Sequence, residues 1–173
     1  NTGVGHQALG ANTTASNNTA FGFYALGANT TAANNTAVGA SALVANTTGT
    51  SNTAVGDGAL YTVSTGISNT AVGRNALLVC TSGTNTALGM NAGDSISTGD
   101  DNLCIGYDAA AYSNNLTTGT SNTIIGNYAR TSAADVSGEI AIGRYVLAQG
   151  ASTATLGVNG SGVSIAIDNS TTT

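Results

Sequence analysis

A glycine recurs along this chain at a nearly constant spacing, and this register constrains the fold more than any other feature of the sequence. Successive members lie 17, 17, 17, 17, 16, 17, 20, 17 and 14 residues apart, and they are Gly5, Gly22, Gly39, Gly56, Gly73, Gly89, Gly106, Gly126, Gly143 and Gly157. Each belongs to a copy of one unit, Asn-Thr-Ala-Val-Gly-x-x-Ala-Leu-x-x-Asn-Thr-Thr-Gly-x-Ser, and residues 35–51 are the cleanest copy. A short fixed period of this kind is typical of a solenoid, in which each unit covers the next.

The composition of the unit predicts β-structure. Seventeen residues cannot hold two helices, because neither half reaches the roughly 12 residues that a helix needs. Two short strands fit instead, as at residues 36–38 and 41–43, with the register glycine allowing a tight bend between them. The Asn-Thr-Thr-Gly segment supplies residues that favour the return turn. We therefore expect an all-β fold, a parallel β-solenoid of about ten 17-residue turns.

The columns of the repeat suggest which side chains face inward. The position before each register glycine is always apolar, so we expect it to point into the coil together with the Thr two residues earlier. The Ala of the Ala-Leu pair is also expected inside. The Ala in the middle of the first strand and the Leu ladder are expected outside, where regular apolar ladders indicate an interface between chains. The sequence thus predicts a homotrimer whose interface includes Leu26, Leu43, Leu60 and Leu77.

Charge and chemistry exclude several classes of function. The chain has 3 basic and 8 acidic residues, and charged residues make up 6% of it, against roughly a quarter in ordinary proteins. Three arginines cannot neutralise a run of phosphates, so we expect no nucleic-acid or membrane partner. A single histidine and two cysteines provide neither a metal cluster nor a catalytic triad. We expect no enzyme activity, no catalytic residue, no metal and no cofactor.

The repeat resembles that of a known group of proteins. The motif Asn-Thr-Ala-Val-Gly-x-x-Ala-Leu with Asn-Thr-Thr-Gly returns is similar to the repeats of bacteriophage tail fibre proteins and to the head repeats of trimeric autotransporter adhesins. Residues 139–143, Glu-Ile-Ala-Ile-Gly, form the copy closest to the adhesin form. The resemblance covers roughly residues 1–157. It implies a left-handed β-roll assembled as a homotrimer, with adhesive or receptor-binding function.

The pattern changes after Gly157, which divides the chain into a repeat domain, residues 1–157, and a C-terminal β transition segment, residues 158–173. The second part reads as an alternating strand behind a glycine-rich turn. It resembles the stretch that precedes a self-cleaving chaperone domain in many tail fibres. This resemblance favours the phage reading over the adhesin reading.

Candidate binding residues lie where the repeat varies, at the two positions after each register glycine and at the three-residue lengthening near residues 112–115. Tyrosine beside Asn or Asp at these positions suits stacking on sugar rings and hydrogen bonding to hydroxyl groups. The residues that we expect to contact glycan are Tyr107, Tyr112, Tyr128 and Tyr145. The alternative is that they are ordinary surface residues of a passive shaft.

Four other features have simpler readings. The Asn that opens each unit is expected to form a stacked amide ladder rather than a row of ligands. Asp94, Asp100 and Asp101 are expected to be solvated, since no calcium-binding pattern surrounds them. Cys80 and Cys104 are expected to be free thiols. An ice-binding surface is disfavoured, because the regular Thr column is expected to face inward.

The sequence therefore predicts a non-enzymatic receptor-binding or shaft segment of a trimeric phage tail fibre, which mediates adhesion to the host surface. Its partners would be two further copies of itself and a host glycan or protein. Its location would be the virion tail fibre or a cell surface. Two alternatives remain open: the head of a trimeric autotransporter adhesin, and a structural unit of an extracellular filament.

Overall fold

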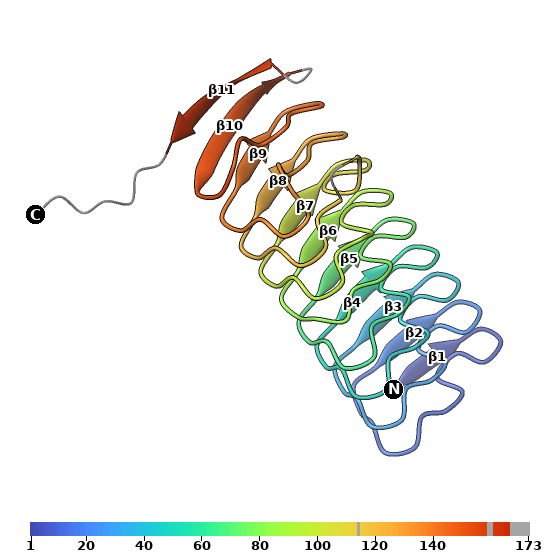
Figure 1. Ribbon diagram of the computed structural model, residues 1–173. Helices are drawn as coiled ribbons and strands as arrows, with labels where there is room; N and C mark the ends of the chain where they lie inside the picture. Colours follow the sequence, from blue (N-terminus) through green and yellow to red (C-terminus); the bar gives the residue numbers. More distant parts are fainter. Residues whose placement is uncertain (114, 159–160, 167–173) are drawn as a thin grey trace, which may run out of the picture.

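The computed structural model is a rod-shaped coil in which the chain stacks one turn on the next (Figure 1). The structure describes residues 1–113, 115–158 and 161–166. One 11-stranded sheet runs along the rod in sequence order. Its strands are β1 (Thr2–Val4), β2 (Thr19–Phe21), β3 (Thr36–Val38), β4 (Thr53–Val55), β5 (Thr70–Val72), β6 (Thr86–Leu88), β7 (Leu103–Ile105), β8 (Thr123–Ile125), β9 (Ile140–Ile142), β10 (Thr153–Val158) and β11 (Ser161–Ala166).

The predicted parallel solenoid is confirmed. Strands β1 to β10 pair in parallel, each with the strand of the next turn, as Thr36 with Thr53 and Thr53 with Thr70. They enclose about nine turns, close to the ten expected. Strand β11 then pairs antiparallel with β10, so the parallel coil gives way to a hairpin after the repeats end. The glycine-rich turn expected there includes residues 159 and 160, which lie outside the described residues.

Each turn contains one strand of the sheet, not the two expected. The predicted second strand is a series of tight turns, because two of its residues have left-handed backbone conformations. In the turn after β4 these are Gly58 (φ 65°) and Leu60 (φ 52°). Their N–H groups donate to the turns on either side, from Gly58 to Ala40 and from Leu60 to Ala76, at 3.0 Å each. The turns are therefore linked along both walls of the coil, although only one wall is a regular sheet.

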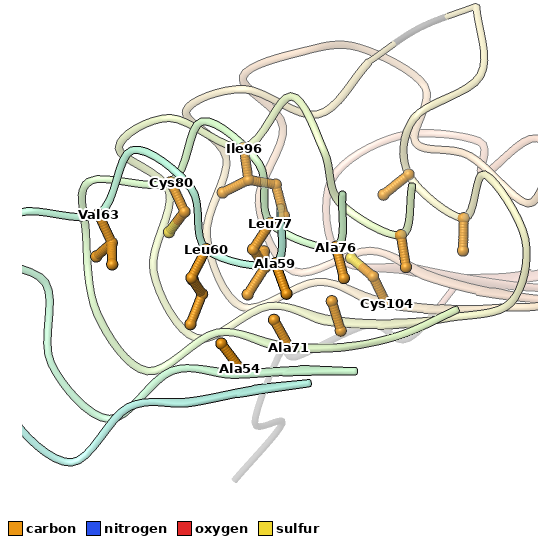
Figure 2. Close-up of a cluster of buried hydrophobic side chains, with 14 of the residues drawn as sticks. Ala54, Ala59, Leu60, Val63, Ala71, Ala76, Leu77, Cys80, Ile96 and Cys104 are labelled. Carbon is orange, nitrogen blue, oxygen red and sulfur yellow. The ribbon is translucent and has the colours of Figure 1, made fainter. Parts of the chain in front are cut away.

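The predicted orientation of the first strand is wrong, and its two faces are exchanged. The small middle residues Ala37, Ala54 and Ala71 are fully buried, whereas the apolar residues before the glycines are exposed or half-buried. Figure 2 shows the reason: Leu60 and Leu77 reach across the coil toward Ala54 and Ala71. The opposite wall fills the core with leucine, so the strand can contribute only small side chains.

The predicted leucine interface is also wrong. Leu26, Leu43, Leu60 and Leu77 have no exposed surface in a single chain. Each has a left-handed backbone conformation that turns its side chain inward. They form the core of the coil together with the buried Ala column that precedes them. They are therefore unavailable for contact with another chain.

The predicted amide ladder is confirmed. The backbone N–H of each ladder Asn donates to the side-chain Oδ1 of the ladder Asn one turn earlier, over 2.9 to 3.0 Å, from Asn1 to Asn122. The side-chain Nδ2 groups donate to buried return-turn carbonyls, as Asn52 does to Gly66 at 2.8 Å. Buried backbone groups at this corner thus find partners that a sheet would otherwise supply.

The last position of the ladder is occupied by Glu139 and not by an Asn. Glu139 is fully buried, and its N–H donates to Oδ1 of Asn122 at 2.9 Å. Its side chain accepts hydrogen bonds from the backbone N–H groups of Ser132 (2.9 Å) and Gly150 (2.8 Å), and from the Ser132 hydroxyl. An acid can occupy this position because both of its oxygens face hydrogen-bond donors, whereas each Asn side chain must also donate to a carbonyl group.

We expect Asn52→Ala to lower the free energy of unfolding by about 2 kcal/mol, because it leaves the buried Asn69 N–H without its acceptor and removes a donor from Gly66. Urea denaturation followed by circular dichroism measures the change. Thr48→Ala, at an exposed position of a return turn, is the control and should leave the midpoint unchanged. Equal midpoints for the two variants would contradict a stabilising ladder.

Candidate binding surfaces

The four tyrosines expected to contact glycan lie together on one corner of the coil. Tyr128 and Tyr145 stack with ring centroids 4.6 Å apart and planes 4° from parallel. Tyr107 meets the edge of Tyr128 at 5.1 Å, and Tyr112 does so at 5.1 Å. Tyr112 also lies 6.3 Å from Tyr145. We call these four residues the tyrosine cluster.

The repeat places these rings within reach of one another. Tyr128 and Tyr145 occupy the second position after a register glycine in successive turns, and β8 and β9 pair in parallel below them. Adjacent strands of a sheet lie about 4.8 Å apart, which is close to the spacing of stacked aromatic rings. The same position in two neighbouring turns therefore produces a stack without any special loop.

Tyr112 reaches the cluster from the lengthened turn. A hydrogen bond from the N–H of Leu116 to the carbonyl of Ala110, at 3.0 Å, closes the loop. The side chain of Asn115 donates to Ser95 Oγ at 3.0 Å and ties the loop to the preceding turn. Tyr112 is 44% exposed.

Two arginines join the tyrosine cluster, and the sequence analysis did not predict this arrangement. The guanidinium carbon of Arg144 lies 4.8 Å from the centroid of the Tyr145 ring, and that of Arg130 lies 5.7 Å from the Tyr112 ring. Arg130 occupies the core leucine position of its turn, which a charged group cannot share with the apolar core. An arginine in an otherwise apolar column is the sequence signal that could have identified it.

The cluster also affects the ionisation of one phenol. Shielding from water raises the pKa of Tyr128 above its ordinary value, and the neighbouring Tyr107, Tyr145 and Asp108 raise it further. Tyr128 therefore remains a neutral hydrogen-bond donor near pH 7.

A second aromatic group occupies the same corner near the other end of the rod. The rings of His6 and Phe23 stack at 5.3 Å, and Tyr24 meets Phe23 edge-on at 4.5 Å. These residues fill the same two repeat positions as Tyr107, Tyr128 and Tyr145. No cation–π contact accompanies them among the described residues.

The outward face of the sheet is a second candidate surface. It carries two parallel ladders, one mostly threonine and one entirely apolar, and no charged residue lies in either ladder across β1 to β10. Exposure in the apolar ladder reaches 57% at Phe21 and 48% at Leu88. We call the ladder the apolar stripe; it comprises Val4, Phe21, Val38, Val55, Val72, Leu88, Ile105, Ile125, Ile142 and Leu156.

The remaining polar candidates have local roles. Asp94 accepts a hydrogen bond from Ser95 at 2.8 Å, and Asp100 accepts one from the N–H of Gly83 at 2.9 Å. The described part of the chain contains no group of three or more His, Cys, Asp or Glu arranged to hold a metal ion. Cys80 and Cys104 are free, as expected, and both are buried. Burial raises the pKa of Cys104 to about 12, so this thiol is unreactive in the folded chain.

Comparisons of the chain with protein-family models, curated proteins and solved structures find no match. Within the residues that the structure describes, no helix is long and apolar enough to cross a membrane.

Proposed function

We propose that this chain is a non-enzymatic shaft or receptor-binding segment of a homotrimeric phage tail fibre, which places it on a virion, or else on another extracellular fibre. The observation that carries the proposal is the apolar stripe, which continues along every turn of a charge-free sheet face. Ten strands at about 4.8 Å make this face on the order of 45 Å long. Monomeric proteins rarely expose an apolar patch of this length.

The proposed occupant of the apolar stripe is a second and third copy of the same chain. A straight stripe with one side chain per turn is matched best by a surface of identical pitch, which another copy of the coil provides. Closed threefold symmetry would cover the stripe on every copy and leave none for further growth. The resemblance to tail fibre and adhesin repeats, which implies left-handed trimeric rolls, supports the same assembly. The proposed interface between chains is therefore the outward face of the sheet, in place of the leucines that the sequence suggested.

Sedimentation equilibrium tests this proposal directly. We expect the unmodified chain to have three times its monomer mass of 16.7 kDa. Val72→Asp, in the middle of the apolar stripe, should yield a monomer with an unchanged β-sheet spectrum, because its carboxylate would be buried without a partner only in the trimer. Thr65→Asp, on an exposed turn away from the sheet, is the control and should remain trimeric. A monomeric unmodified chain would overturn the proposal.

Contact with a host glycan is the second part of the proposal, and the tyrosine cluster is its proposed site. The cluster presents ring faces, phenolic hydroxyls and amide groups on an accessible corner. Trimerisation would place three such clusters on one rod, so weak contacts could combine into a stable attachment.

A second candidate function, ice binding, is favoured by one observation. The Thr column lies on the outward face of the sheet and is exposed or half-buried, so the reason for disfavouring this function no longer holds. Threonines would recur at the regular strand spacing on a flat surface. A monomeric chain that produces thermal hysteresis, which Thr70→Tyr abolishes and Thr65→Tyr does not, would favour ice binding over the fibre. A trimer without thermal hysteresis would exclude it.

A further inference from the structure

Positive charge is concentrated at the tyrosine cluster. The chain carries a formal net charge of −5 and contains three arginines, two of which, Arg130 and Arg144, lie against rings of this cluster. Neither guanidinium forms an ion pair with a carboxylate among the described residues. Both charges are therefore available to a ligand, in a protein that is acidic overall and whose one other arginine is Arg74.

The rings hold these charges in place. A guanidinium that lies over an aromatic face is attracted by the ring and loses part of its freedom to move. Arg144 is held in this way by Tyr145, which is itself stacked on Tyr128. Arg130 is held in the same way by Tyr112. An oxyanion that reaches the cluster would meet planar donors already ordered for two parallel hydrogen bonds.

The groups around the two arginines suit the uncharged part of a sugar that carries such an oxyanion. Ring faces pack against the apolar face of a pyranose, and phenols bond its hydroxyl groups. The Asn127 side chain accepts a hydrogen bond from the N–H of Tyr107 at 3.1 Å through its oxygen, which leaves its amide N–H groups as donors. The site thus combines aromatic faces, neutral hydrogen-bonding groups and cations within one corner of three turns.

We infer that the tyrosine cluster with Arg130 and Arg144 binds acidic saccharides, whose carboxylate pairs with guanidinium while the sugar ring lies on tyrosine. This inference rests on the proposed function, because it specifies the glycan that the cluster contacts. Hexuronic acids and sialic acids share the required chemistry. The His6, Phe23 and Tyr24 group has the rings without arginine, so it lacks the feature that selects for acid.

The chain contains a matched control. Arg74 occupies the first position after a register glycine, as Arg144 does, and is exposed on the same corner. It has no cation–π contact with a ring of the described residues. Arg74→Gln therefore removes the same charge from the same repeat position without altering the cluster.

Binding is measured on the assembled protein by NMR titration of the tyrosine ring signals with methyl glucuronide, N-acetylneuraminic acid and neutral methyl glucoside. We expect both acids to bind about tenfold more tightly than the neutral sugar. Arg144→Gln should weaken acid binding about tenfold and leave neutral binding unchanged, whereas Arg74→Gln should change neither. Acid binding should also weaken as salt is raised.

Other outcomes separate this inference from the proposal beneath it. Equal affinity for the acidic and neutral sugars, unaffected by Arg144→Gln, would overturn the acid preference while leaving a glycan site in place. An equal loss in Arg74→Gln and Arg144→Gln would show a nonspecific charge effect and also overturn it. Absence of binding to all three sugars would overturn both the inference and the proposed glycan contact. The proposed trimer is tested separately, by sedimentation equilibrium.

Discussion

Leu60→Asp is expected to unfold the chain rather than to separate its subunits. Leu60 has no exposed surface, and the apolar neighbours around it in Figure 2 offer no partner for a carboxylate. An uncompensated buried charge costs about 3–5 kcal/mol, which is a large share of the stability of an ordinary domain. Circular dichroism should therefore show loss of the β-sheet signal, or a urea midpoint far below that of the unmodified chain.

Val55→Asp provides the matched control for this prediction. The two positions are five residues apart in the same turn, and the substitution introduces the same charge, but the Val55 side chain lies on the outward face of the sheet. We expect Val55→Asp to retain the β-sheet signal whether or not the chains remain associated. If Leu60→Asp instead left the chain folded and made it monomeric, the result would support the leucine interface that the structure contradicts.

Gly56→Ala is the second large effect, an expected loss of about 4 kcal/mol in the free energy of unfolding. Gly56 has φ 135°, a conformation that costs an L-residue about 1–3 kcal/mol. A Cβ at this position would also lie 2.5 Å from the carbonyl oxygen of Gly73 and 2.6 Å from its carbon, both in the backbone of the next turn. Relieving that contact would force adjacent turns apart, at a further cost of about 1–3 kcal/mol.

Gly150→Ala separates these two contributions. Gly150 has a similar φ of 126°, but no heavy atom lies within 4 Å of the position that its Cβ would occupy. Urea denaturation of both variants should show the larger loss for Gly56→Ala, and the difference measures the cost of crowding between turns. Equal losses would mean that the conformation alone, and not the close stacking, requires glycine at the corner.

The period of the sequence was sufficient to predict the parallel coil, because only a stack of equivalent turns gives every copy of the unit the same environment. The amide ladder could be predicted for the same reason. The orientation of the strand could not, since side chains alternate along a strand and an error of one residue exchanges both faces. Treating the most apolar column as the core led to that error. The core is filled by residues such as Leu60 from the opposite wall.

The backbone conformation of the wall opposite the sheet could not be predicted for a different reason. Left-handed conformations are rare for leucine, so Leu43 or Leu60 gives no local signal that it adopts one. Glycine at the equivalent position of another copy, Gly93, is a clue, and it is seen only when all copies are aligned. The tyrosines could be chosen from the variable positions, but their assembly into one cluster depended on turn spacing and on the loop that carries Tyr112.

The uneven steps of the repeat indicate where the unit tolerates a change in length. The unit between Gly73 and Gly89 is one residue short, and that between Gly106 and Gly126 is three residues long, yet Thr70 still pairs with Thr86 and Leu103 with Thr123. The added residues between Gly106 and Gly126 do not alter the pairing of the strands on either side of them. Insertions there can vary, or be grafted by design, while the length of the rod changes only by whole turns. The number of turns and the length of the loops are thus encoded in separate parts of the same repeat.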